Sequence, residues 1–356
     1  MCAASESKAR LPVYNPAATS TSIKPAVRHS TKVRVFFSPE SLPEITSSLL
    51  RVSSATSIKK YIRCKKESKA CATIFNWKII TVASCKMVKR KPVVAGRFYK
   101  ENPSELTQEL GGLMKHLPGE EKKKILGAVS PHAGYMYSGS VAGELYSRSK
   151  IPRRIIILSP NHTGYGARIS MFPDGFWETP LGDVEVDSEL CSLIQSKHRL
   201  IERETYAHLF EHSIEVQLPF LQHLKDGFIL VPITLMHLTY GECENMAGVI
   251  SDSIKELGEN VLILASSDLN HYQDQLVTET KDMMAIDRVL SLDPEGLLEV
   301  TSKHHISMCG VISTTVMLIA CLKLGAHNAE LLKHATSGDV SGDYSRVVGY
   351  AAISVY

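Results

Sequence analysis

The fold of this 356-residue chain is decided by the stretch IIILSPNH, residues 155–162. Four consecutive branched aliphatic residues predict a strand that is buried on both faces, as at the centre of a sheet covered by helices. Pro160 cannot donate to a sheet ladder, so we expect the strand to end there. His162 would then lie just beyond the carboxyl end of a buried strand, the edge at which open α/β sheets bind ligands.

Two further stretches repeat this arrangement. The run ILGAV, residues 125–129, leads to His132, and the run VLILA, residues 261–265, leads to Asp268 and His271. Because parallel packing brings the carboxyl ends of strands to one edge of a sheet, we expect these polar side chains to converge there. The functional expectations below depend on that convergence.

The rest of the chain after residue 92 alternates between helical and strand patterns, which predicts a layered α/β/α domain with a mostly parallel or mixed central sheet. Strands are expected at 228–235, interrupted by Pro232, and at 347–355. Within 212–224 a kink or an early stop is expected at Pro219, with His212 and Glu215 on one face of the preceding turn. Apolar residues at helical spacing predict helices at 103–117, 138–149, 187–197, 242–257, 278–290, 294–303 and 311–324.

The net charge of +3 hides two opposite segments. Residues 1–86 carry 15 Lys and Arg against 4 Asp and Glu, a net of +11, whereas residues 87–356 carry 25 against 33, a net of −8. An acidic body disfavours a nucleic-acid partner. No apolar run reaches the roughly 18 residues of a membrane span, so no membrane partner is expected. The eight cysteines form neither a Cys-x-x-Cys pair nor a small disulfide framework, which favours a reducing, cytoplasmic setting.

The basic segment 1–86 is rich in Ser and Thr and lacks a convincing amphipathic period. We interpret it as a disordered extension. The alternative is an organellar transit peptide, because such peptides are Arg- and Ser-rich and poor in acids. Met87 would make a natural first residue for the folded part, so we expect a single α/β domain over residues 87–356.

His132 and His162 occupy equivalent positions on two loops at strand ends. Because neutral imidazole is the commonest metal ligand, the pair predicts a shared metal site, whereas either histidine alone would more often be structural. The residues leave the third ligand open. The candidates are Asp268, Glu215, His212, His271, His305 and Cys309.

Two of these candidates have further interpretations. His271 lies three residues after Asp268, and imidazole titrates near neutrality, so His271 suits a proton-transfer role. Asp268 would orient it, or would simply cap a turn. Cys309 comes just before a predicted helix, where a thiolate would have a lowered pKa; the alternative is a small buried hydrophobe.

Five motifs together resemble the Memo family, and the resemblance covers about residues 92–356. It is closer to the microbial members, known as AmmeMemoRadiSam system protein B. The motifs occur in the family's order: PHAGY at 131–135, SPNH at 159–162, EHSIE at 211–215, SSD at 266–268 with His271, and MCG at 308–310.

The resemblance implies a fold similar to that of class III extradiol ring-cleaving dioxygenases. It implies that His132, His162 and Cys309 bind a metal, with iron or copper as candidates and zinc possible. Asp268, His271 and His212 would be the catalytic residues of the same cleft. Cys309 stands where those dioxygenases place a glutamate, and a soft thiolate shifts the preference toward copper(I), zinc or iron and makes the site oxidisable. The microbial relatives are named alongside a radical-SAM protein, which implies such a partner.

Three functions follow as hypotheses. The first is a metal-binding protein with redox activity toward oxygen or reduced oxygen species. The second is a dioxygenase proper, with iron(II), a catechol-like small-molecule substrate and His271 as acid and base. The third is a non-catalytic pocket that binds a peptide or another protein partner. A shared fold is a poor warrant for a shared reaction, so ring cleavage is not inherited from the resemblance alone.

Overall fold

The computed structural model describes residues 72–75, 78–81, 87–114 and 121–356. The fold below lies within the unit 68–356. The disordered extension expected over 1–86 lies outside the described residues, apart from strands β1 (Ala72–Phe75) and β2 (Lys78–Thr81), which pair antiparallel.

The centre of the domain is a run of four parallel strands. In order across the sheet these are β5 (Gly127–Ser130), β13 (Val261–Ser266), β7 (Arg154–Pro160) and β12 (Ile229–Leu235). Every residue of all four strands is buried, as the continuous apolar runs predicted. The expected α/β fold with a mixed sheet is confirmed.

Shorter or antiparallel strands extend this centre on both sides. Beyond β5, β16 (Val347–Val355) runs antiparallel and pairs with both β14 (His271–Gln273) and β15 (Ala329–Thr336). The remaining strands are β10 (Gly182–Val186), β9 (Gly175–Thr179) and β3 (Val88–Arg90) beyond β12, β8 (Ile169–Met171) with β11 (Glu202–Arg203), and the separate pair β4 (Lys123–Lys124) and β6 (Ser149–Lys150).

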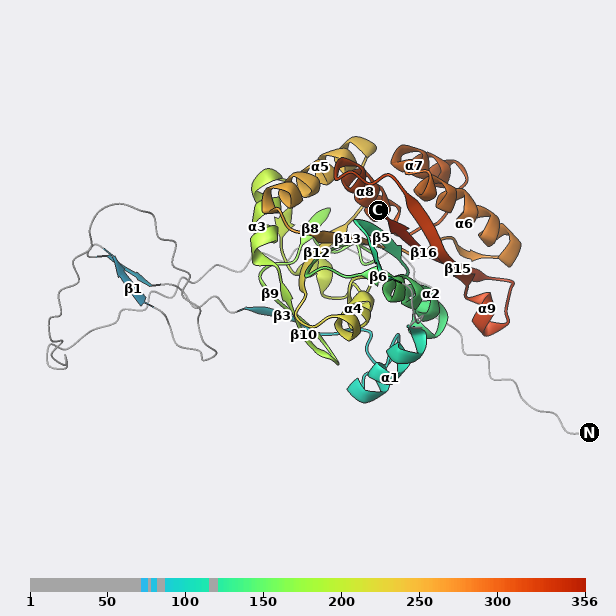
Figure 1. Cartoon of the computed structure of the whole chain (residues 1–356), viewed down its shortest axis with the longest axis horizontal. Coiled ribbons are helices and arrows are strands. Elements are labelled where there is room, and N and C mark those ends of the chain that lie inside the picture. The colour runs from blue at the N-terminus through green and yellow to red at the C-terminus, as the bar shows by residue number, and fades with distance from the viewer. Residues whose placement is uncertain (1–71, 76–77, 82–86, 115–120) are drawn as a thin grey trace, which may run out of the picture. The chain divides into compact units, whose positions relative to one another are not determined.

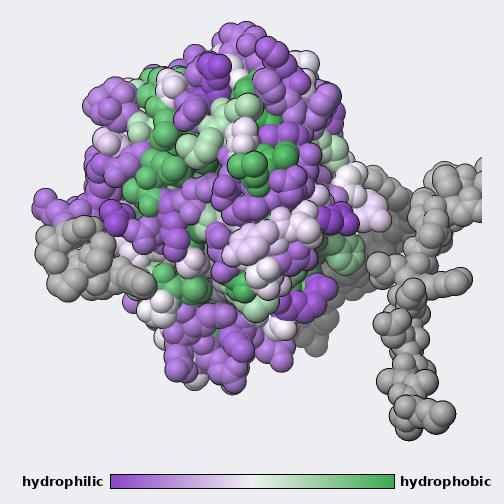
Figure 2. Space-filling model, turned by 90° about the vertical axis from the view of Figure 1, so that its right-hand side faces the viewer, coloured by the Kyte–Doolittle hydropathy of each residue, from purple (hydrophilic) through white to green (hydrophobic). Residues whose placement is uncertain are grey.

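Helices cover both faces of the sheet (Figure 1). Figure 2 shows, on one side of the molecule, mainly hydrophilic side chains with hydrophobic ones in scattered groups, as expected when most apolar residues are inside. Among the helices in the described part of the chain, none is both long and apolar enough to cross a membrane. One layer contains α3 (Ser188–Lys197), α5 (Tyr240–Leu257), α6 (Gln275–Leu290), α7 (Pro294–Lys303) and α8 (Val311–Lys323), and the other contains α1 (Pro103–Leu113), α2 (Tyr135–Arg148) and α4 (Leu218–Leu224).

Most helix ends follow local chemistry. Helix α5 is capped at its start by a capping box between Thr239 and Glu242 and at its end by Gly258, whose φ of 69° favours glycine. Helix α6 begins at Gln275, three residues before the predicted start, because the Asp274 side chain caps it. Helix α2 likewise begins three residues early, at Tyr135, and α1 ends at Leu113 instead of residue 117.

Two prolines behave differently from expectation. Pro232 does not interrupt β12, because its carbonyl still accepts the Phe172 N–H and the strand continues on both sides. Pro219 does not kink or stop a helix, because α4 begins at Leu218 and places the proline in its first turn, where no N–H is needed. The residues before it form a 3₁₀ turn, Glu215–Gln217.

Glu215 is the first residue of this turn, whereas His212 precedes it in irregular chain and lines a cavity that Glu215 does not. The expectation that the two residues share one face of a helical turn is therefore wrong. Glu215 is completely buried and pairs with Arg90 of β3 at 2.5 Å. Its carboxylate also accepts the Val93 N–H and the Tyr99 hydroxyl. Arg90 in turn donates to the Glu211 carbonyl at 2.5 Å. The segment after β3 is thereby fixed to the loop that precedes α4.

Replacing Glu215 with Gln should leave the Arg90 guanidinium buried without its counter-charge. We expect a loss of about 3–5 kcal/mol in the free energy of unfolding, measured by urea denaturation of the full chain. The matched control is Glu256→Gln, because Glu256 pairs with Lys197 at 2.5 Å but is more than half exposed. That change should cost at most about 1 kcal/mol. Equal losses in the two variants would contradict a buried, structural ion pair.

Candidate metal centre

A cavity of about 730 Å³ lies at the carboxyl ends of β5, β13 and β7. The convergence expected from the sequence is therefore present. Two other candidates, Glu215 and His305, do not line the cavity. The six site residues that the sequence and the family resemblance predicted do line it: His132, His162, His212, Asp268, His271 and Cys309. Aromatic and basic neighbours complete the wall, including Arg97, Phe98, Tyr137, Tyr272 and Tyr350.

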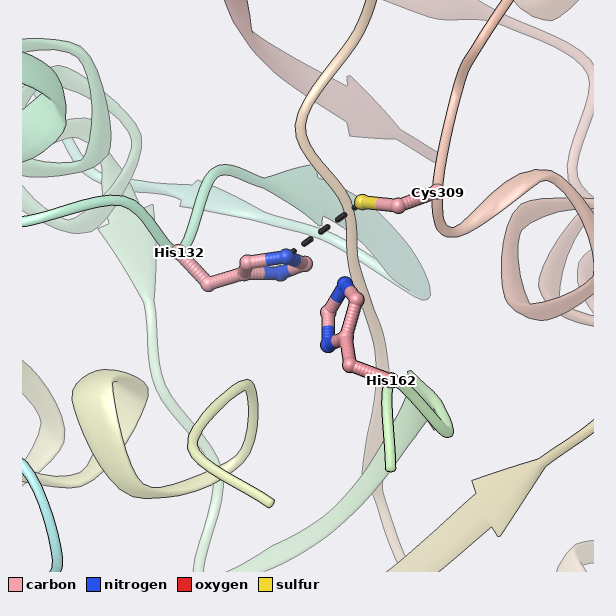
Figure 3. Close-up of side chains that lie close together, drawn as sticks. All are labelled: His132, His162 and Cys309. Carbon is pink, nitrogen blue, oxygen red and sulfur yellow. Dashed lines mark hydrogen bonds between the residues drawn. The ribbon is translucent and has the colours of Figure 1, made fainter. Parts of the chain in front are cut away.

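Three side chains from three different loops point toward one another in this cavity (Figure 3). His132 follows β5, His162 follows β7, and Cys309 comes just before α8. One potential ligand atom from each lies within 4.8 Å of the other two, and Cys309 Sγ lies 3.3 Å from His132 Nε2. The sulfur and nitrogen ligands of a tetrahedral zinc ion lie about 3.5 Å apart, so this spacing fits a shared metal ion.

The hydrogen-bond partners of His132 fix which ring nitrogen is free. Its Nδ1 lies 3.0 Å from Ser266 Oγ. The Ser266 hydroxyl has a single hydrogen, and it donates that hydrogen to the Ser213 carbonyl at 2.7 Å. Ser266 Oγ must therefore accept from His132, so Nδ1 carries the proton and Nε2 keeps its lone pair. Burial lowers the pKa of His132 well below its usual value, which keeps the ring neutral.

A buried carboxylate fixes which ring nitrogen of His162 carries the hydrogen. Glu211 is completely buried, and its Oε1 lies 3.0 Å from His162 Nδ1. The carboxylate accepts four more hydrogen bonds, from the N–H groups of His162, His212 and Ser213 and from the Ser213 hydroxyl. A carboxylate so occupied orients His162 and leaves its Nε2 for the cavity.

This pairing shifts both ionisation equilibria. Burial acts to raise the pKa of Glu211, but the hydrogen bond from His162 and its neighbours lowers it far more, so Glu211 is ionised. Burial acts to lower the pKa of His162, and the Glu211 carboxylate outweighs this, so the net pKa is raised. A proton on His162 Nε2 therefore competes with a metal ion for the same lone pair.

The Cys309 sulfur is held by the loop after β13. Its Sγ accepts the Asp268 N–H at 3.3 Å, and the next residue, Gly310, donates its N–H to Ser267 Oγ at 3.0 Å. A Cβ at Gly310 would lie 2.5 Å from the Ser266 carbonyl oxygen, so only glycine permits this approach. Burial raises the pKa of the Cys309 thiol, and the Asp268 carboxylate raises it further. A thiolate at this position requires a bound cation.

The other expected site residues surround this group. Asp268 accepts the His132 backbone N–H at 2.8 Å, and burial raises the pKa of its carboxyl. The His212 ring stacks on His162 with centroids 5.1 Å apart, and burial lowers the pKa of His212. His271 donates from Nδ1 to the Ser307 carbonyl at 2.9 Å, because a carbonyl can only accept.

Sequence reasoning assigned no role to Glu211 or Ser266, the two groups that fix the histidine tautomers. Glu211 also belongs to a second possible ligand group with His162 and His212. Its oxygens are already engaged by five donors, so we regard Glu211 as a group that orients a ligand. The signal for Glu211 in the sequence was its position directly before His212, in the EHSIE motif, which was interpreted mainly through its histidine.

Comparison with known proteins agrees with this architecture. Residues 90–354 match the family model described as Memo-like protein. MEMO1 family proteins from Pyrobaculum aerophilum and Desulfurococcus amylolyticus are each 44% identical to this chain, over 75% and 76% of it and over 99% and 100% of their own lengths. A MEMO1 family protein from Thermotoga neapolitana is 43% identical over 73% of this chain and 97% of its own length. The resemblance inferred from five motifs is confirmed, and the chain belongs to the Memo family.

Proposed function

We propose that this protein is a metal-dependent redox protein that holds one iron or copper ion through His132, His162 and Cys309. The observation that carries the proposal is that both imidazoles have Nδ1 engaged by an acceptor, which leaves both Nε2 lone pairs free. One potential ligand atom from each histidine and the Cys309 sulfur lie within 4.8 Å of one another. Neutral histidines with hydrogen-bonded Nδ1 groups are the usual form of metal ligands.

The donor set narrows the choice of metal. Two imidazoles and one thiolate suit copper, zinc or iron, whereas magnesium and calcium prefer oxygen ligands. Zinc has no redox chemistry, so a redox function requires iron or copper. When bound, such an ion would supply electron exchange with oxygen or reduced oxygen species, and three protein ligands would leave positions open for them.

Residues of the chain would accept a proton from a molecule in the cavity and would limit the water around it. Neutral His271 keeps a lone pair on Nε2, because its Nδ1 hydrogen is donated to Ser307. It therefore suits the acceptance of a proton from a molecule in the cavity. Phe98 and Tyr137 contribute apolar wall that limits the water around that molecule. Asp268 holds the backbone of His132 and so keeps the ligand loop in place.

A second candidate is the ring-cleaving dioxygenase, favoured by the presence of His271 in the same cavity. A volume of about 730 Å³ and a partly aromatic wall suit a small ring compound. Anaerobic reconstitution with iron(II), followed by oxygen uptake with a panel of catechols, tests this candidate. Uptake that depends on His271 would support it, and no uptake across the panel would reject it.

Changing both His132 and His162 to Ala should abolish metal binding, because two of three ligands are removed. After anaerobic loading with iron or copper and gel filtration, elemental analysis should find about one equivalent in the wild type and almost none in the double variant. The matched control is the double change His304→Ala and His327→Ala at two exposed histidines, which should retain the metal. Full occupancy in the His132 and His162 variant would refute the site.

Replacing Glu211 with Gln should weaken metal binding without removing a ligand. The amide presents an N–H₂ group to several donors, so His162 loses its fixed orientation, and the affinity should fall about 10- to 100-fold. Competition with a chelator measures the change. Glu202→Gln, at an exposed position on β11, is the control and should leave affinity unchanged. An unaltered affinity in the Glu211 variant would show that the carboxylate does not orient the ligand.

A further inference from the structure

On the side of the cavity formed by His271, two loops are joined through one buried amide. Asn270, in the loop after β13, is completely buried. Its Oδ1 accepts both the N–H and the hydroxyl of Ser307, each at 3.2 Å. Its Nδ2 donates to Gln273 Oε1 at 2.9 Å. Both ends of the amide are therefore engaged, so its orientation is fixed.

Ser307 connects Asn270 to His271 through hydrogen bonds. The Ser307 hydroxyl accepts the His271 backbone N–H at 2.8 Å, and the Ser307 carbonyl accepts from His271 Nδ1 at 2.9 Å. The partly exposed imidazole thus has its backbone and one ring nitrogen tied to a single residue. Without Ser307 in place, the ring would be free to rotate and to exchange its proton between the two nitrogens.

A second buried group, the Asp282 carboxylate, accepts a hydrogen bond from Asn270. Asp282 of α6 is completely buried, and its Oδ1 accepts the Asn270 N–H at 2.9 Å. Its Oδ2 lies 2.9 Å from His334 Nε2 on β15. A Cβ at Gly349 would collide with this carboxylate, so β16 has glycine where it passes Asp282. Asp282 is not among the residues that line the cavity, and hydrogen bonds through Asn270 and Ser307 connect it to His271.

We propose that Asn270, Ser307 and Asp282 are positioning residues that hold His271 in the tautomer with hydrogen on Nδ1, so that Nε2 is the proton acceptor in the cavity. The use of that tautomer rests on the proposed function, in which His271 accepts a proton. The tautomer itself is set by the chain alone and is present without metal. Because Ser307 lies two residues before Cys309, the same hydrogen bonds also connect His271 to the loop that carries the sulfur.

Histidine side-chain NMR of the metal-free, ¹⁵N-labelled full chain tests this inference at a pH where His271 is neutral. The wild type should show His271 with hydrogen on Nδ1. Asn270→Ala removes the amide that holds Ser307, and the loss of one hydrogen bond should shift the ratio of the two tautomers by about fivefold or more. Asn245→Ala, at an exposed position on α5, is the matched control and should leave the ratio unchanged.

His132 and His162 serve as internal references, because their tautomers are set by Ser266 and Glu211. A shift confined to His271 supports the inference. An unchanged His271, equal shifts at all three histidines, or wild-type hydrogen on Nε2 would each overturn it. If Asn270→Ala does not fold, Ser307→Ala removes the hydroxyl alone and should shift His271 in the same direction. Since no metal is present, failure here is separate from failure of the metal-binding test.

Discussion

The parallel alignment of β5, β13 and β7 is the constraint on which the rest of the structure depends. These buried strands end at one edge, and β13 lies between the other two. The loop after β13 therefore lies between the two histidine loops. Its Asp268 contacts two of the three candidate ligand residues, because the carboxylate accepts the His132 N–H and the backbone N–H donates to the Cys309 sulfur. A sheet with a different strand order would separate these groups.

The second requirement is that each buried carboxylate has hydrogen-bond donors or a counter-charge. An ionised carboxylate without partners is costly to bury, and Glu211 is stabilised by five hydrogen bonds. Glu215, four residues later, is equally buried and is neutralised by Arg90, which also donates to the Glu211 carbonyl. The Glu211 carboxylate orients His162, a candidate ligand. The Glu215 carboxylate holds Arg90, which in turn fixes the chain at Glu211. Both belong to one irregular stretch before α4.

The sequence was most informative where apolar periodicity and capping residues act locally. The three buried strands, the bounds of α7 and the extent of β16 were predicted closely, because each depends on neighbouring residues. The stretch around Glu211 and Glu215 could not be predicted, because its conformation depends on Arg90, more than a hundred residues earlier. The residues alone also left six candidates for a third ligand. Only the folded chain brings the Cys309 sulfur to His132, while Glu215 points into a separate ion pair.

The proposed site requires that two imidazole nitrogens and one sulfur form a single coordination sphere. X-ray absorption spectroscopy of the full chain, loaded anaerobically with iron or copper, measures those ligands directly. We expect one sulfur neighbour at about 2.3 Å together with nitrogen neighbours at about 2.0–2.1 Å, by analogy with zinc sites. The sulfur signal should disappear in a Cys309→Ser variant. A wild-type spectrum with only nitrogen and oxygen neighbours would contradict coordination by the Cys309 sulfur.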